Sequence, residues 1–306
     1  MATPHPLSAA ALLSVKGWVA VVTGGGTGIG LMIAQTLAVN GARVYITGRR
    51  ADVLETSARI HGSPERLGLS GGSIVPVVGD ITSKDSIRDV VAKIRDREGF
   101  VNVLVNNAGT WLGKTEATPE DGPEAFSEGM LAEDKEGNWQ KTYDINVTSQ
   151  YFVTAAFVPL LAKAASSPAG RPGNVINIGS ISGLLRLPQN RQFAYNASKA
   201  AFTHLTRQLA FELSHDNINI RVNGIAPGYF PSELTTGPSN EENLSVVDEE
   251  RFLRFVEGMG ITKKGKRMGT PGELASVVLT LATNEFIWGT IMVVDGGLSL
   301  TAPGTM

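Results

Sequence analysis

A tyrosine and a lysine occur at helical spacing in the segment Tyr195-Asn-Ala-Ser-Lys199. Residues at positions i and i+4 lie on one face of a helix, so the phenol and the ammonium can face the same cavity. A free tyrosine has a pKa near ~10, too high for easy proton exchange at neutral pH, but a nearby cation stabilises the phenolate and lowers that pKa. We therefore expect Tyr195 and Lys199 to form a general acid/base pair.

A serine stands upstream of this pair, directly after an apolar run. The run Asn174–Ile178 reads as a strand, and Gly179-Ser180-Ile181-Ser182-Gly183 follows it. Doubly wound folds bind ligands at the carboxyl ends of their strands, where the Ser180 hydroxyl could hydrogen-bond a substrate oxygen. The alternatives are that Ser180 only caps a turn, or that Ser182 makes the substrate contact.

A glycine-rich turn near the N-terminus has the composition of a phosphate-binding site. The predicted strand Trp18–Thr23 leads into Gly24-Gly-Gly-Thr27-Gly28-Ile29-Gly30, and a helical pattern follows. The spacing is G-x-x-x-G-x-G. Glycines let the backbone approach a pyrophosphate, and the N-terminus of a helix attracts anions. The placement between the first strand and the first helix predicts dinucleotide binding, against the alternative of a glycine turn without a ligand.

The end of the second predicted strand indicates which dinucleotide is bound. NAD-specific folds usually carry an acidic residue there for the ribose hydroxyls. This chain has Thr47-Gly48-Arg49-Arg50 instead, and arginine is well suited to bind a phosphate through two nitrogens. We predict NADP(H) rather than NAD(H) as cofactor, with solvated surface charges as the alternative for Arg49 and Arg50.

The elements that must position these residues alternate between strands and helices. Short apolar runs rich in Val and Ile predict buried strands at Trp18–Thr23, Arg43–Thr47, Ser73–Val78, Val101–Val105, Asn174–Ile178, Ile220–Ile225 and Ile291–Val294. Helical patterns fall at Gly30–Asn40, Lys84–Arg97, Thr142–Lys163, Tyr195–Ser214 and Pro271–Thr283. This order predicts an α/β fold: a single doubly wound, Rossmann-like parallel sheet flanked by helices, in one domain spanning residues 1–306.

Two segments interrupt the alternation. Residues 110–140 are polar and acidic, and we expect a solvated surface excursion. Residues 229–267 form a long connection, which predicts a lid over the substrate. Its expected helical part is Val247–Glu257, with Phe252, Phe255 and Val256 as apolar contacts.

The composition argues against several other classes of function. The net charge is -2, which gives no reason to expect a nucleic acid or an anionic membrane as partner, and no apolar run reaches the ~20 residues of a membrane span. There is no cysteine, and the four histidines show no metal-ligand spacing. We expect no metal site, no secretory signal at the N-terminus and a cytoplasmic location.

Taken in order, these motifs resemble those of the short-chain dehydrogenase/reductase family in its common single-domain form. The matching segments span about residues 17 to 298 and are Thr23-Gly24-x-x-x-Gly28-Ile29-Gly30, Asp80-Ile81, Asn106-Asn107-Ala108-Gly109, Asn146, Ser180, Tyr195-x-x-x-Lys199, Pro227-Gly228 and Val294-Asp295-Gly296-Gly297. Each match alone is modest, whereas the ordered set is highly specific. Within the family, the chain resembles NADP-dependent members of the 3-oxoacyl reductase type.

The resemblance implies a role for each matching residue. Tyr195 would donate a proton to the carbonyl oxygen, and Lys199 would bind the nicotinamide ribose and depress the tyrosine pKa. Ser180 would steady the reacting oxygen, and Asn146 would hold a water in the proton relay. The residues that would contact the cofactor are Gly24, Thr27, Gly28, Ile29, Gly30, Arg49, Arg50, Asp80, Ile81, Asn107, Ala108, Gly109, Tyr195, Lys199, Pro227, Gly228 and Ser232. The family also often forms tetramers through its two long middle helices, so a homo-oligomer, tetramer or dimer, is expected.

Some features depart from the family pattern. The gap between Ser180 and Tyr195 is longer than usual and contains residues 186–191, which leaves one wall of the substrate pocket undefined. Ser232 stands near the position where the family often has a threonine that contacts the nicotinamide amide. The acidic segment 110–140 is also longer than usual.

The leading functional hypothesis is NADPH-dependent reduction of a ketone to a secondary alcohol. The second is an NADP-linked alcohol or polyol dehydrogenase that works in the oxidising direction. A third is a non-catalytic NADP(H)-binding sensor or scaffold, which the presence of Tyr195, Lys199 and Ser180 disfavours. The partner would in each enzymatic case be a small carbonyl or alcohol compound.

Overall fold

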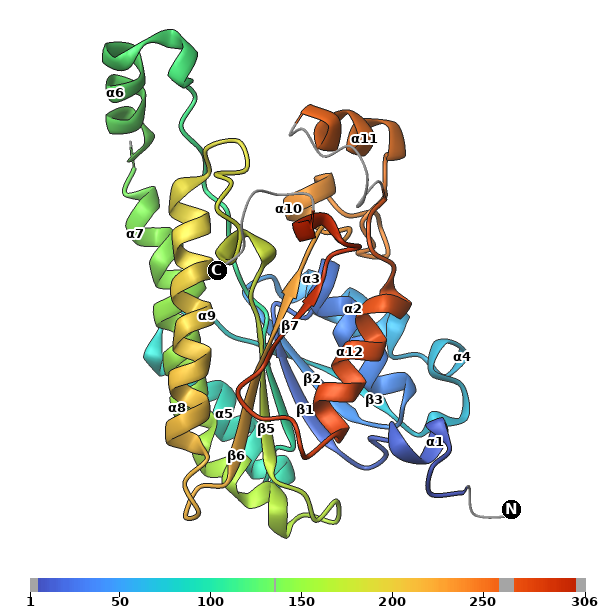
Figure 1. Ribbon diagram of the computed structural model, residues 1–306. Coiled ribbons are helices and arrows are strands. Elements are labelled where there is room, and N and C mark those ends of the chain that lie inside the picture. The colour runs from blue at the N-terminus through green and yellow to red at the C-terminus, as the bar shows by residue number, and fades with distance from the viewer. Residues whose placement is uncertain (1–4, 135, 259–266, 301–306) are drawn as a thin grey trace.

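A seven-stranded parallel sheet forms the centre of the computed structural model, which describes residues 5–134, 136–258 and 267–300 (Figure 1). The strand order is β3-β2-β1-β4-β5-β6-β7, so the direction of winding reverses between β1 and β4. The strands are β1 Val19–Thr23, β2 Arg43–Gly48, β3 Ser73–Val78, β4 Val103–Asn106, β5 Gly173–Ile178, β6 Ile220–Pro227 and β7 Ile291–Val294. The predicted fold class, a doubly wound Rossmann-like sheet, is confirmed.

Helices cover both faces of this sheet (Figure 1). On one face, α2 (Gly28–Val39) packs against α12 (Pro271–Thr283), and their side chains share a core with residues of the sheet such as Val22 and Ile176. On the other face lie α5 (Lys84–Glu98), α8 (Ser149–Ala162) and α9 (Phe193–Leu213). The central strands are buried from end to end, which is why they read as continuous apolar runs in the sequence.

The shorter elements lie around this framework. They are α1 Ala9–Leu12, α3 Ala51–His61, α4 Pro64–Leu67, α6 Pro123–Leu131, α7 Asn138–Tyr143, α10 Glu233–Thr236 and α11 Glu249–Gly258. The sequence patterns did not predict α3. Its buried side chains are only Leu54, Ser57 and His61, and two of these three are polar, so few apolar residues mark the helix. This omission matters because α3 follows directly after Arg50, one of the residues expected to contact the cofactor.

One long helical run extends from Asn138 through α7 and α8 to Ser166, and its α8 part lies on the same face of the sheet as α5 and α9. By length and composition alone it could cross a membrane, with a mean hydropathy of 1.3. In the structure Val153, Phe157 and Leu161 pack into the core beneath the sheet, as a core helix of this fold does. The run starts four residues before the expected Thr142 and contains a π-helical turn, Asp144–Thr148, which the sequence did not indicate.

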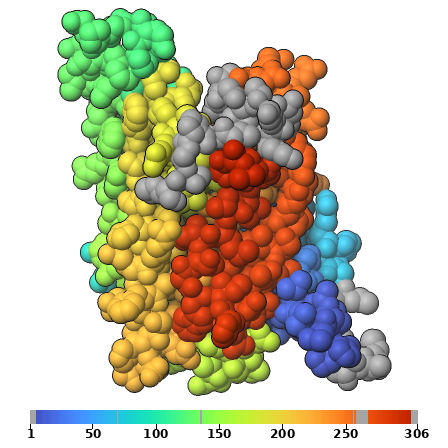
Figure 2. Space-filling view, viewed as in Figure 1, coloured from blue at the N-terminus to red at the C-terminus, as the bar shows by residue number. Residues whose placement is uncertain are grey.

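The two irregular segments stand at the same end of the molecule, α6 on one side and α11 on the other (Figures 1 and 2). Helix α6 has no buried residue and extends away from the sheet. Helix α11 overlaps the helix expected at Val247–Glu257, and its Phe252 and Val256 pack against Ile181. The side chain of Phe255 and residues 259–266 of the expected lid lie outside the described residues.

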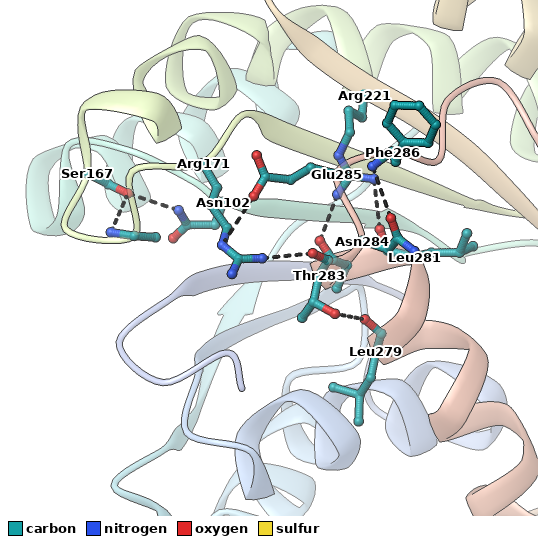
Figure 3. Close-up of polar contacts among 12 residues, drawn as sticks. Asn102, Ser167, Arg171, Arg221, Leu279, Leu281, Thr283, Asn284, Glu285 and Phe286 are labelled. Carbon is teal, nitrogen blue, oxygen red and sulfur yellow. Dashed lines mark hydrogen bonds and ion pairs between the residues drawn. The ribbon is translucent and has the colours of Figure 1, made fainter. Parts of the chain in front are cut away.

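Two arginines hold the C-terminal end of α12 on the sheet (Figure 3). Arg221, at the start of β6, is 1% exposed and donates to the carbonyl oxygens of Leu281 at 3.0 Å and Ala282 at 2.7 Å. Arg171 donates to the carbonyl of Thr283 at 2.7 Å. These carbonyls have no partner within a helix, so the guanidinium groups satisfy them and complement the helix dipole. Burial lowers the pKa of Arg221 to about 10.

Replacing the buried Arg221 is expected to lower the free energy of unfolding much more than replacing the partly exposed Arg171. Arg221→Met keeps the length of the side chain but leaves buried carbonyls without donors, which predicts a loss of about 3 kcal/mol in the free energy of unfolding. Arg171→Met, at a partly exposed site, should cost about 1 kcal/mol or less. Urea denaturation of both variants would check this. Equal costs would mean that Arg221 does not anchor α12.

Candidate active site

A cleft of about 510 Å³ opens at the carboxyl ends of the strands, where the strand order reverses between β1 and β4. Doubly wound folds bind ligands at such a reversal of strand order. The glycine turn after β1, the arginines after β2, Asp80 and Ile81 after β3, and Asn107-Ala108-Gly109 after β4 all line it. Tyr195 and Lys199 of α9 and Ser232 after β6 line it as well. The fold therefore brings together residues from distant parts of the chain.

The glycine turn leaves no room for side chains, as a dinucleotide cradle requires. A Cβ on Gly30 would lie 2.1 Å from the carbonyl oxygen of Gly24 and 2.4 Å from the Asn107 amide nitrogen. Gly24 and Gly28 have φ of +63° and +52°, which favours glycine. Thr27 precedes α2 as its N-cap residue, so the free N–H groups of that helix face the cleft. The residues present fit a pyrophosphate at this point.

Side-chain hydrogen bonds lock the turn to the next strand. The Asn107 amide donates to the carbonyls of Thr23 at 2.9 Å and Gly24 at 3.1 Å. In return, the Thr23 hydroxyl accepts from the backbone N–H groups of Asn107 and Ala108. The predicted Asn107-Ala108-Gly109 segment is thus held against the glycine turn along the floor of the cleft.

Ser180, the residue expected to steady a reacting oxygen, lies close enough to the Tyr195 phenol to influence its pKa. Ser180 precedes a short 3₁₀ turn, and its hydroxyl also contacts that of Ser182 at 3.0 Å. Burial raises the pKa of Tyr195, while Ser180 opposes this rise. The direction differs from the sequence-based expectation of a lowered pKa, because desolvation of the phenolate outweighs the favourable contacts.

Lys199 lies one helical turn beyond Tyr195, with its Nζ 5.7 Å from the centre of the tyrosine ring. The ammonium is buried and donates to the carbonyl of Ile178, at the end of β5, at 3.1 Å. Desolvation lowers the pKa of Lys199 to about 8. A cation is therefore kept close to the phenol at the cost of burying its charge.

That cost should appear as a pH-dependent stability difference. The Lys199 pKa falls from 10.5 to about 8 on folding, which corresponds to about 3 kcal/mol. Below pH 8 the buried lysine is charged, and the folded protein bears the full loss of stability. Between pH 8 and 10.5 this loss declines, because Lys199 releases its proton in the folded protein before it does so in the unfolded chain. Lys199→Met also loses the bond to Ile178, worth about 1 kcal/mol. We therefore expect the free energy of unfolding of Lys199→Met to be about 2 kcal/mol higher than that of the wild type at pH 7.

Urea denaturation of both proteins from pH 7 to 10.5 measures this difference directly. The advantage of Lys199→Met should shrink as the pH rises above 8. An advantage that stayed constant or grew with pH would contradict a depressed Lys199 pKa.

Asn146 lies in the π-helical turn and does not line the cleft, but it connects segments that do. Its side chain donates to the carbonyl of Thr110 at 2.9 Å and to the Ser198 hydroxyl at 3.0 Å, and it accepts from the Thr110 N–H at 2.8 Å. A Cβ on Gly109 would lie 3.2 Å from the Asn146 Oδ1 and 3.6 Å from the Lys199 Nζ. Asn146 thus joins the loop after β4 to α9 beside the lysine. The π-turn places it there, as such turns often do at functional sites.

A feature that the sequence did not predict lies in the longer segment before Tyr195. Gln189, Asn190 and Arg191 all have positive φ, between 45° and 65°, which is strained for residues other than glycine. Arg191 pins this turn to Thr115, whose N–H donates to the Arg191 carbonyl and whose carbonyl accepts from Arg191 Nε, both at 3.1 Å. The buried Gln189 side chain lies close enough to the Tyr229 phenol to influence its pKa.

Tyr229 lies between α11 and the catalytic pair. Its ring packs edge-on against Phe252 of α11, with centroids 5.6 Å apart, and its phenol interacts electrostatically with Tyr195. Burial raises the pKa of Tyr229. Gln189, Tyr229 and Phe252 of α11 therefore lie together beside the catalytic pair, and none of them lines the cleft described above.

Most of the predicted contact residues line the cleft, but Pro227 and Gly228 do not. Pro227 ends β6, and a Cβ on Gly228 would lie 2.8 Å from the Cα of Asp295, so Gly228 allows close packing of the segment after β7. Sequence reasoning missed Val53 and Leu54 of α3, and Glu233 of α10, all of which line the cleft. A recognised α3 would have indicated the first two. Nothing in the sequence around Glu233 marked it.

Among the described residues, no cluster of three His, Asp or Glu side chains could hold a metal ion.

Comparison with known proteins agrees with this geometry. The family model for short chain dehydrogenases matches residues 18–243. A curated relative, the short-chain dehydrogenase/reductase PhomF of Diaporthe leptostromiformis, is 39% identical over 96% of both chains. Another, the rhamnolipids biosynthesis 3-oxoacyl-(acyl-carrier-protein) reductase of Pseudomonas aeruginosa, is 34% identical over 94% of this chain and 98% of its own.

A solved structure shows the same fold with its cofactor named. The Pseudomonas aeruginosa RhlG/NADP active-site complex superimposes with a TM-score of 0.74 at 32% identity, covering 97% of this chain and 100% of that one. The family match covers most of the chain and includes the glycine turn, Ser180, Tyr195 and Lys199. The protein is therefore a member of the short-chain dehydrogenase/reductase family of oxidoreductases.

Proposed function

We propose that this protein reduces a ketone to a secondary alcohol with NADPH. The observation that carries the proposal is that one cleft contains a glycine cradle, two arginines after β2 and the Tyr195–Lys199 pair. The NADP complex of the similar structure supports the choice of cofactor. The 3-oxoacyl reductase among the relatives supports the direction of the reaction and a β-keto type of substrate.

The residues fit an NADP(H) molecule extended along the cleft. The glycine turn and the N-terminus of α2 would hold the pyrophosphate, and Arg49 and Arg50 the 2′-phosphate. Asp80 and Ile81 would flank the adenine, and Lys199 would bind the nicotinamide ribose. When bound, the cofactor supplies the hydride.

Side chains of this protein would supply the proton that the carbonyl oxygen gains during the reduction. Ser180 would hydrogen-bond the carbonyl oxygen and keep it near the phenol, since Ser180 lies close enough to Tyr195 to lower its pKa. Tyr195 would donate its proton to that oxygen as the carbonyl is reduced. Lys199 would stabilise the resulting phenolate from its buried position. Tyr229, Phe252 and the lid would shield the reacting atoms from water.

The test is a two-directional assay. NADPH oxidation is followed with 3-oxoacyl thioesters, cyclic ketones, quinones and ketoses, and NADP⁺ reduction is followed with matched alcohols and polyols. We expect turnover with at least one 3-oxo compound and a preference for NADPH over NADH. Turnover confined to polyols with NADP⁺ would instead identify an alcohol dehydrogenase. Tight NADPH binding without turnover in either direction would identify a binding protein.

We further propose a cytoplasmic homo-oligomer, dimer or tetramer, assembled through α8 and α9. The support is the family resemblance and the exposure of Phe211 on α9, which is 79% accessible. Light scattering that gave a monomer mass at micromolar concentration would contradict this assembly.

A further inference from the structure

The arginine expected to bind the 2′-phosphate is already engaged by a carboxylate. Arg50 Nη2 donates to Glu233 Oε2 at 2.7 Å, and Nη1 donates to Oε1 at 3.1 Å. This paired contact joins the end of β2 to the start of α10 across the mouth of the cleft. The hydrogen bond to Glu233 raises the pKa of Arg50.

The same carboxylate also lies against the glycine turn. The Thr27 hydroxyl is 3.4 Å from Glu233 Oε2 and donates to it. The neighbouring Ser232 packs on the turn so closely that a Cβ on Gly28 would lie 2.8 Å from the Ser232 Cβ. Glu233 therefore places a negative charge between the turn that fits the pyrophosphate and the arginine that fits the 2′-phosphate.

A phosphate needs the nitrogens that Glu233 occupies. Arginine binds carboxylates and phosphates through two parallel N–H groups, and both terminal nitrogens of Arg50 point at Glu233. The side chains of Arg50 and Glu233 are 56% and 34% exposed, so the pair is weak enough to exchange for a dianionic ligand. NADP(H) carries such a group on its adenosine ribose, whereas NAD(H) does not.

We propose that Glu233 competes with the 2′-phosphate of NADP(H) for Arg50, and so determines how strongly the protein prefers NADP(H) to NAD(H). Binding of NADP(H) would exchange the carboxylate for the phosphate on Arg50. NAD(H) would leave the Arg50–Glu233 pair intact. The proposal rests on the NADP(H) part of the proposed function, and it does not depend on the substrate.

Calorimetric titration of the full chain tests the competition without any turnover. The ligands are NADPH, NADH, and the fragments 2′,5′-ADP and 5′-ADP, which differ in the position of a phosphate. Glu233→Gln keeps the shape of the side chain and removes its charge. We expect it to bind NADPH and 2′,5′-ADP about 3- to 10-fold more tightly, and NADH and 5′-ADP within about 2-fold of the wild type.

Two further variants make the assignment specific. In an Arg50→Ala background, Glu233→Gln should no longer tighten NADPH binding, because the contested group is gone. Glu242→Gln removes a similar exposed pair, with Arg66 at 3.2 Å, whose residues do not line the cleft. It should leave the affinity for NADPH unchanged.

Three results would overturn the proposal. Weaker NADPH binding by Glu233→Gln would mean that the carboxylate orients Arg50 rather than competing for it. An equal gain for NADPH and NADH would mean that Glu233 only repels the pyrophosphate. A gain that persisted without Arg50 would exclude the competition at that residue. The proposed cofactor itself is judged separately, on the wild type, which must bind NADPH more tightly than NADH.

Discussion

Tyr195→Phe is expected to reduce kcat about 100- to 10,000-fold while leaving NADPH binding close to that of the wild type. The substitution removes the hydroxyl that would donate the proton and keeps the ring that lines the cleft. Proton transfer by a positioned side chain contributes about that much to the rate. The phenol lies beside Ser180 and near the buried ammonium of Lys199, so no other described group has its position.

A matched tyrosine on the surface serves as the control. Tyr151 of α8 is 43% exposed and contacts Phe152 rather than the cleft. Tyr151→Phe should leave kcat and KM unchanged. Steady-state kinetics and fluorescence titration of NADPH separate the two effects. A Tyr195→Phe enzyme that kept wild-type kcat would exclude Tyr195 as the proton donor.

Gly30→Ala is expected to abolish cofactor binding, with a loss of affinity for NADPH of at least about 100-fold. The added Cβ would lie 2.1 Å from the Gly24 carbonyl oxygen, closer than any real contact of this kind. The neighbouring atoms belong to the backbone and to the Asn107 amide, which two hydrogen bonds hold in place. The glycine turn itself would therefore have to move. Such overpacking costs about 1–3 kcal/mol or more, and it displaces the N–H groups that would bind the pyrophosphate.

Gly272→Ala gives the comparison for this variant. Gly272 lies in the first turn of α12, and an added Cβ there meets nothing within 4 Å. It should preserve both stability and NADPH affinity. Circular dichroism and calorimetry distinguish an unfolded Gly30→Ala protein from a folded one that has lost its binding site. A folded Gly30→Ala variant with normal affinity would show that the glycine turn is not the pyrophosphate site.

The sequence predicted the sheet because its central strands are covered on both faces. Strands such as β1 and β5 are buried throughout, so they appear as apolar runs with little ambiguity. Helix α3 was missed because two of its three buried side chains, Ser57 and His61, are polar, and α6 because none of its side chains is buried. Amphipathic periodicity is a weak signal where a helix contributes little to the core.

The candidate site was predictable to the extent that it consists of local motifs. The Gly24–Gly30 turn and the spacing of Tyr195 and Lys199 are properties of short segments, and the cleft unites them. The contacts between distant segments were not predictable. The Arg50–Glu233 ion pair and the interaction of Gln189 with Tyr229 join residues that only the fold brings together. The raised pKa of Tyr195 likewise depends on burial, which a sequence does not display.

The most direct test of the central claim follows the hydride itself. The wild type and Tyr195→Phe are incubated with NADPH deuterated at the transferable C4 position and a 3-oxoacyl thioester, and the products are examined by mass spectrometry. The account predicts that the wild type forms a secondary alcohol carrying one deuterium on its carbinol carbon, and that Tyr195→Phe forms almost none. Intact ketone in the presence of bound NADPH, or an alcohol without the label, would contradict it.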